Sequence, residues 1–144
     1  MENPEIHALS DFVEVSFQPL DHTIVFRWMC PFLNEAEFRL SYLTLLERAV
    51  QHRCPYWLLD LRRRYANTPA QDRWVANDFC ERIRQAFPMA VPVYAAYLVS
   101  PVALAHYTQK VVPALNAPAA SCYRVAAFLE EGLANSWLRT QRLF

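Results

Sequence analysis

The segment at residues 56–64 constrains the fold of this chain more than any other. It reads Tyr-Trp-Leu-Leu-Asp-Leu-Arg-Arg-Arg, an apolar run that ends abruptly in charge. Apolar residues at successive positions, rather than at alternating ones, indicate a strand buried on both faces, as strands of parallel sheets are. The charged residues then follow the carboxyl end of this strand, where α/β folds place their binding sites.

Four further strands are expected beside this one. Residues 12–17 alternate apolar and polar side chains, and a turn leads from them into residues 23–28, so these two segments are expected to form a hairpin. Residues 93–99 form a second, nearly all-apolar run, and residues 121–128 are expected to form the last strand.

Two capping patterns predict the starts of helices. Asn34 is followed three residues later by Glu37, a capping-box pattern, and helical spacing of apolar residues continues from there to about residue 53. Thr68 is followed by Pro69 and, at the third helical position, by Gln71, which predicts a second helix.

Weaker signals predict two more helices. Ser100 and Pro101 repeat the pattern of a cap followed by proline and predict a third helix, which Pro113 is expected to end or bend. Glu130 and Glu131 favour the start of a last helix, because carboxylates are stabilised at helix N-termini.

This order of elements predicts a single α/β domain. The chain reads β-β-α-β-α-β-α-β-α, which implies right-handed crossovers and a mixed, mostly parallel sheet of about five strands with four helices. The domain is expected to span residues 12–144, and residues 1–11 are expected to be a loose lead-in. A chain of 144 residues is long enough to bury a sizeable core in one domain.

Composition argues against several classes of protein. The formal net charge is zero, so the chain lacks the basic field that nucleic-acid binding needs. No apolar run is long enough to span a membrane and the N-terminus does not resemble a signal peptide, so a cytoplasmic location is expected. Gly132 is the only glycine, which excludes phosphate-cradling loops, and no cofactor is expected. The four cysteines and four histidines lack metal-ligand spacing, so reduced thiols and no metal site are expected.

Three segments carry a resemblance to a known family. They read TIVFRW at 23–28, YWLLD at 56–60 and YLVSP at 97–101, and each is followed by a predicted helix. Over residues 12–140 this pattern resembles the small bacterial SpoIIAA-like proteins of the STAS family, also described as STAS/SEC14-related. The resemblance implies a STAS fold and a non-catalytic regulatory domain that binds a protein partner or a small ligand.

The same resemblance bears on phosphorylation. In anti-sigma-factor antagonists of this family, a serine that follows a strand-ending Asp is phosphorylated by a partner kinase. Here Leu61 follows Asp60, so the chain departs from that pattern. The hydroxyl groups expected in this area belong to Thr68 and Ser100.

Candidate binding residues gather at the strand–helix junctions. Asp60, Arg62 and Arg63 could form an anion or carboxylate pocket, since arginine suits bidentate recognition and the helix capped by Thr68 adds partial positive charge. The alternative is a solvated loop in which Asp60 pairs with one arginine. Three adjacent arginines cannot all point one way, so at most two are expected to line a site. Trp28 lies at a junction where apolar surface could stay open, either as a ligand pocket or as a dimer face.

Other residues suggest a nucleophile and an interface. Ser100 is the best-placed nucleophile, but the chain lacks G-x-S-x-G and places no base beside it, so no catalytic residue is expected. Leu40 and Leu43 widen the apolar stripe of the helix that starts at Asn34, which favours a homodimer interface.

We therefore expect a non-enzymatic regulatory or binding domain that recognises a protein partner or a small ligand at the junctions around Asp60 and Ser100. Two alternatives stay open. The first is a carrier of a small apolar or anionic ligand, and the second is a hydrolase-like enzyme that uses Ser100.

Overall fold

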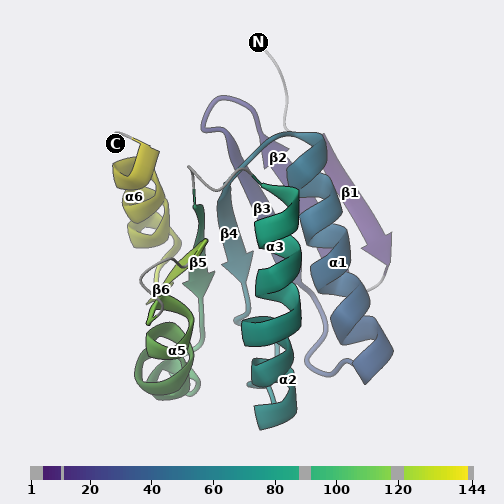
Figure 1. The fold of residues 1–144 in the computed structure, drawn as a ribbon, viewed down its shortest axis with the longest axis vertical. Coiled ribbons are helices and arrows are strands. Elements are labelled where there is room, and N and C mark those ends of the chain that lie inside the picture. The colour runs from purple at the N-terminus through teal and green to yellow at the C-terminus, as the bar shows by residue number, and fades with distance from the viewer. Residues whose placement is uncertain (1–4, 11, 88–91, 118–121, 143–144) are drawn as a thin grey trace.

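A single mixed sheet forms the centre of the protein (Figure 1). The structure is a computed structural model that describes residues 5–10, 12–87, 92–117 and 122–142. The strands are β1 (Glu5–Ser10), β2 (Val13–Gln18), β3 (Thr23–Trp28), β4 (Tyr56–Asp60), β5 (Val93–Leu98) and β6 (Tyr123–Phe128). They lie in the order β1-β2-β3-β4-β5-β6, antiparallel from β1 to β3 and parallel from β3 to β6.

Four helical segments follow the strands. The helices are α1 (Glu35–Gln51), α2 (Pro69–Trp74), α3 (Cys80–Ala86), α4 (Leu104–His106), α5 (Val112–Asn116) and α6 (Glu131–Arg142), with π-helical turns η1 (Val75–Phe79) and η2 (Tyr107–Val111). The turn η1 joins α2 to α3 in one continuous helix, and η2 joins α4 to α5 in another. The predicted α/β class, with a mostly parallel sheet and four helices, is therefore confirmed.

The predicted lead-in contains an additional strand. Residues 5–10, expected to be loose, form β1 and pair antiparallel with β2, with Glu5 opposite Phe17. Without β1, the outer edge of β2 would present unpaired backbone groups, and β1 satisfies them. Six residues with little alternation give too weak a pattern to be read as a strand from the sequence.

The strand order determines which face of the sheet each helix covers. From β3 to β6, each right-handed crossover leads to the next strand on the same side of the sheet. This places α1, α2–α3 and α4–α5 on the same face. The last helix, α6, packs on the other face, against β4, β5 and β6. The side chains of β4 alternate accordingly: Trp57 and Leu59 enter the larger core, and Leu58 contacts the smaller core beneath α6.

Both capping boxes are confirmed. The side chain of Asn34 accepts from the backbone N–H of Glu37 at 2.8 Å, and the Glu37 carboxylate accepts from the backbone N–H of Asn34 at 3.0 Å. Thr68 and Gln71 make the equivalent pair of bonds at 3.1 and 3.0 Å. These contacts fix the first turns of α1 and α2, which both begin at the carboxyl edge of the sheet.

The third helical segment differs from its prediction. Ser100 does not cap it: a turn closed by the Ala103 N–H and the Ser100 carbonyl at 3.1 Å comes first, and α4 begins at Leu104. Pro113 does not end the segment either, because it lies in the first turn of α5, directly after η2. Proline lacks the N–H that an α-helix uses, and the wider turn before it accommodates that loss.

Candidate functional site

Four charged side chains meet at the carboxyl ends of β3 and β4, on the face that α6 covers. Nη1 of Arg27 donates to Oδ2 of Asp60 at 2.8 Å, and Nε and Nη2 of Arg62 donate to the two Asp60 oxygens at 3.0 and 2.9 Å. Arg27 also donates to both oxygens of Glu131, at 2.9 and 3.1 Å. Glu131 is the first residue of α6, so this cluster connects β3, β4 and α6.

The arginines of the cluster favour the ionised form of Asp60. Burial alone would raise the pKa of Asp60, but hydrogen bonds from Arg62 and Arg27 outweigh that effect and hold the pKa below its ordinary value of 3.8. The hydrogen bonds from Arg27 to Glu131 raise the pKa of this guanidinium further, despite its partial burial. Asp60 also accepts the backbone N–H of Arg62 at 3.1 Å, so its oxygens are already engaged.

A pocket of about 600 Å³ opens beside this cluster and brings four of the predicted residues together. Its lining residues are Glu14, Arg27, Trp28, Met29, Asp60, Arg62, Arg63 and Glu131. Two of the three adjacent arginines line it, as expected. Arg62 turns back onto Asp60, whereas Arg63 points outward, with Nη1 3.6 Å from the sulfur of Met29. Among the described residues, no carboxylate lies within ion-pair distance of Arg63.

The two predicted hydroxyl residues lie elsewhere. The Thr68 hydroxyl is engaged in its capping box, and neither Thr68 nor Ser100 lines the pocket that contains Asp60. His106, on the helix after Ser100, bonds to Asp72 at 2.9 Å rather than to a serine. The structure therefore does not bring Ser100 together with the other predicted site residues.

Arg64, the third arginine of the run, turns to the opposite face of the sheet. It is buried, and its guanidinium lies over the rings of Trp28 and Phe38, at 5.3 and 5.1 Å from their centroids. Nη2 donates to Oδ1 of Asn67 at 2.6 Å, whereas Nη1 is buried and has no hydrogen-bond partner within the described part of the chain. Cation–π contacts contribute about 1–2 kcal/mol, whereas moving a cation out of water costs several kcal/mol. The contacts with the two rings therefore offset only part of the cost of burying the Arg64 guanidinium.

A chain of hydrogen bonds leads from Arg64 to the third helical segment. Nδ2 of Asn67 donates to Oδ1 of Asp72 at 3.1 Å, and Oδ2 of Asp72 bonds Nε2 of His106 at 2.9 Å. Tyr42 lies beside this chain: burial raises the pKa of its hydroxyl, while Arg64 and Asn67 lower it in part. The chain connects the loop after β4 to α2 and to α4, 34 residues further along the sequence.

A small cavity of about 110 Å³ adjoins this chain of hydrogen bonds. Its polar lining residues are Tyr42, Asn67, Asp72, Tyr97 and Lys110. Its apolar lining residues are Val75, Ala76, Val111, Ala114 and Leu115. Both π-helical turns contribute, η1 through residues 75–76 and η2 through residues 110–111. Such turns are rare and occur frequently at functional sites.

No sequence pattern pointed to this second group of residues. Asp72 and His106 belong to different helices, and no motif spacing connects them with Arg64 and Asn67. The sequence does indicate that three adjacent arginines cannot all line one site. This implies a different environment for the third arginine.

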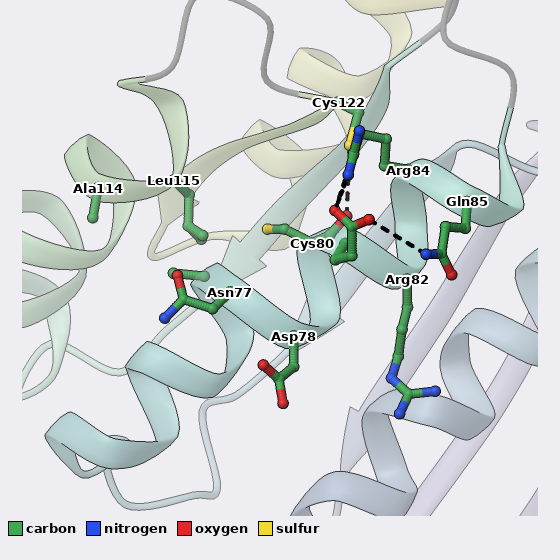
Figure 2. Close-up of a pocket in the computed structure, with 11 residues that line it drawn as sticks. Asn77, Asp78, Cys80, Arg82, Arg84, Gln85, Ala114, Leu115 and Cys122 are labelled. Carbon is green, nitrogen blue, oxygen red and sulfur yellow. Dashed lines mark hydrogen bonds and ion pairs between the residues drawn. The ribbon is translucent and has the colours of Figure 1, made fainter.

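Another hollow lies along the α2–α3 helix (Figure 2). It has a volume of about 750 Å³ and is bordered by η1, α3, α5 and Cys122. Glu81 and Arg84 pair with each other beside it, and the thiol of Cys122 donates to the Cys80 carbonyl at 3.7 Å. Burial raises the pKa of the Cys80 thiol to about 12, so this thiol is a poor nucleophile at neutral pH.

Comparisons with models of protein families, with curated proteins and with solved structures found no match. Within the described ranges, no three His, Cys, Asp or Glu side chains lie close enough together to hold a metal ion. None of the helices described here has the length and apolar character required to cross a membrane.

Proposed function

We propose that this protein is a non-enzymatic, cytoplasmic binding domain that recognises a protein partner through the carboxyl edge of its sheet. The observation that carries the proposal is the position of Arg63 beside an exposed apolar surface. Three exposed apolar side chains come from the loops after β3 and β4: Met29, which contacts Arg63, and Phe32 and Tyr65, which are 69% and 70% exposed. We refer to these four residues as the edge surface.

Two loops hold the edge surface in place. The backbone N–H of Tyr65 donates to the Pro31 carbonyl at 3.0 Å, which ties the loop after β4 to the loop after β3. The contact between Arg63 and Met29 joins the same loops a second time. A surface fixed in this way loses little conformational entropy on binding, which favours affinity.

The chemistry of the edge surface suits a protein partner. Aromatic residues, methionine and arginine are enriched at protein interfaces, and arginine and tyrosine dominate their hot spots. In the adjacent pocket, Arg27 and Arg62 pair with Asp60 and Glu131, whereas Glu14 and Arg63 also line the pocket and take no part in these pairs. We infer that Arg63 binds an acidic side chain of the partner. Apolar side chains of the partner would then cover Phe32 and Tyr65.

The experiment is an affinity pull-down from the organism that makes the protein, with matched variants as bait. Wild-type protein is expected to retain a partner that Arg63→Glu and Phe32→Ala each lose. Arg139→Glu, which reverses an exposed charge on α6, serves as the control and should retain it. A partner held equally by all four baits would show that the edge surface is not the binding site, as would the absence of any retained protein.

A second surface supports the predicted homodimer. Leu40, Leu43 and Val50 lie at helical spacing on α1, and Leu40 is 57% exposed. Leu43 and Val50 also line a shallow groove of about 460 Å³ between α1 and α3. We propose that two copies of the chain associate through this stripe, which would remove its apolar side chains from water.

We also propose that the chain is related to SpoIIAA-like proteins, because the order of elements from β2 to α6 agrees with that of the family. This relationship is consistent with a regulatory binding role and does not point to any particular residue of the edge surface.

A further inference from the structure

The pocket at the carboxyl ends of β3 and β4 is lined by two charged side chains of opposite sign that pair with nothing. Three arginines and three carboxylates line this pocket, and two of each form the ion pairs described above. The other two are Glu14, which is half-buried, and Arg63, which is exposed. Within the described part of the chain, neither forms an ion pair. The pocket therefore offers one carboxylate and one guanidinium to a ligand.

The strand register brings these two groups to the same opening. Glu14 lies on β2 directly opposite Arg27 on β3. Met29 follows two positions beyond Arg27, and its N–H donates to the Phe12 carbonyl at 2.7 Å, so the two chains stay paired up to this point. Diagonal neighbours of this kind are about 7–8 Å apart. Because Nη1 of Arg63 lies 3.6 Å from the sulfur of Met29, its guanidinium stands near the position diagonal to Glu14.

A carboxylate and a guanidinium at this spacing suit a compact ligand that carries both charges. The guanidinium of Arg63 can donate two parallel hydrogen bonds to a ligand carboxylate. The carboxylate of Glu14 can accept from a ligand ammonium group. A ligand with only one of these charges would leave either Glu14 or Arg63 without a counter-charge. In an α-amino acid a single carbon atom joins the ammonium and carboxylate groups, so both can reach their partners across a short gap.

The size and the remaining lining of the pocket limit the side chain of such a ligand. The pocket volume of about 600 Å³ lies within the range of about 300–1,000 Å³ typical of small-molecule sites. An amino acid therefore fits with its side chain included. Since the other charged groups of the pocket are already paired, an uncharged side chain would leave those pairs undisturbed. The exposed thioether of Met29 provides an apolar contact for it.

We propose that this pocket binds a zwitterionic α-amino acid with an uncharged side chain, whose carboxylate pairs with Arg63 and whose ammonium group pairs with Glu14. Arg63 also belongs to the edge surface, so a bound amino acid would compete with the partner proposed above. Binding of the amino acid does not depend on that partner, and either proposal can fail without the other.

The test is isothermal titration of the purified full chain, with no partner present, against L-leucine and L-glutamine. These two probes represent apolar and polar uncharged side chains. At least one of them is expected to give a saturable signal with one site per chain. Two-dimensional amide NMR with the same amino acid should show saturable shifts at Glu14, Met29 and residues 62–63.

Three related compounds test the need for both charges of the ligand. The amide of the amino acid that binds lacks the carboxylate, and its N-acetyl derivative lacks the ammonium group. The third compound, 6-aminohexanoate, carries both charges but separates them by five carbon atoms. Each compound should bind at least 10-fold more weakly than the amino acid.

Two matched pairs of variants test the two protein groups. Glu14→Gln and Arg63→Gln each remove one charge and should each weaken binding at least 10-fold. Neither position lies in a hydrophobic core, so both variants should fold. Glu47→Gln and Arg139→Gln make the same changes at exposed positions outside the pocket and should bind like the wild type.

Several results would overturn the proposal. One is that neither amino acid binds the wild-type protein, and another is that the amide or the N-acetyl derivative binds as tightly as the amino acid. Undiminished binding in both Glu14→Gln and Arg63→Gln would place the ligand elsewhere. Loss of binding in Arg63→Gln with full binding in Glu14→Gln would reveal a simple anion site and would equally overturn the proposal.

Discussion

Arg27 and Asp60 are register partners on β3 and β4, and their ion pair lies at the strand where the sheet changes from antiparallel to parallel pairing. The same arginine binds Glu131 at the start of α6. One guanidinium therefore holds together two strands and the helix that covers them, and the stability of this corner depends on the charge of Asp60.

Asp60→Asn is expected to lower the free energy of unfolding by about 2 kcal/mol at pH 7, because it removes the carboxylate that both Arg27 and Arg62 bind. Since folding lowers the pKa of Asp60, its stabilising effect is present above the unfolded pKa and is lost as the pH falls below about 3.8. Denaturant unfolding of both proteins at pH 7 and pH 3 measures this. A difference that stays constant or grows on acidification would contradict the assignment.

Thr68→Ala is expected to reduce stability by about 1 kcal/mol, because it removes one half of the capping box of α2. Thr68→Ser keeps the hydroxyl and should lose much less. Thr140→Ala, on the exposed surface of α6, is a control expected to change stability by less than about 0.5 kcal/mol. Thermal unfolding of the four proteins compares them, and equal stability of the Ala and Ser variants at position 68 would refute the role of the cap.

Leu138→Ala is expected to cost about 3 kcal/mol, because Leu138 is 1% exposed in the small core between α6 and the sheet. Leu133 lies on the same helix and is 56% exposed, so Leu133→Ala should be close to neutral. Urea unfolding gives both values. Similar losses for the two variants would mean that α6 packs through another face.

Cys54 and Cys80 should resist alkylation in the folded protein at pH 8. Burial raises the pKa of the first thiol to about 11 and that of the second to about 12, so both are almost entirely protonated at this pH. Peptide mapping after iodoacetamide treatment should find both cysteines unmodified until denaturant is added. Rapid labelling of either one in the native protein would count against the burial described here.

Leu40→Glu should convert a dimer into a monomer in light scattering coupled to size exclusion, because it places a charge in the apolar stripe of α1. Leu20→Glu changes a still more exposed leucine in a turn outside this stripe and should leave the dimer intact. The dimer proposal fails if the wild-type protein elutes as a monomer, or if the two variants behave alike.

Much of the architecture follows from local sequence signals. The two continuous apolar runs predict β4 and β5, and the pairs Asn34–Glu37 and Thr68–Gln71 locate the first turns of α1 and α2 because both partners lie within one turn. The strand β1 is not predictable in this way. Six residues become a strand here because an unpaired edge is available beside them, and that edge exists only once β2 and β3 have paired.

The candidate sites show the same division between local and distant contacts. Asp60, Arg62 and Arg63 are close in sequence and line one pocket. Glu131 joins them from 71 positions beyond Asp60, and His106 meets Asp72 across 34 positions. No spacing rule relates such residues, because their approach depends on the crossover connections of the whole sheet. At Ser100 a local pattern was present but its prediction was wrong. The pattern predicted a helix cap, but the chain makes one more turn before the helix begins.

The placement of α6 alone on its face of the sheet has a consequence for biosynthesis. Every helix that covers the other face precedes β6 in the chain, so that side can be assembled while the protein is still being made. The face formed by Val25, Leu58, Ala96 and Leu98 has to wait for α6, the last element of the fold to leave the ribosome. Until then the nascent chain presents a bare apolar sheet, and chaperones have their greatest opportunity to bind it during this interval.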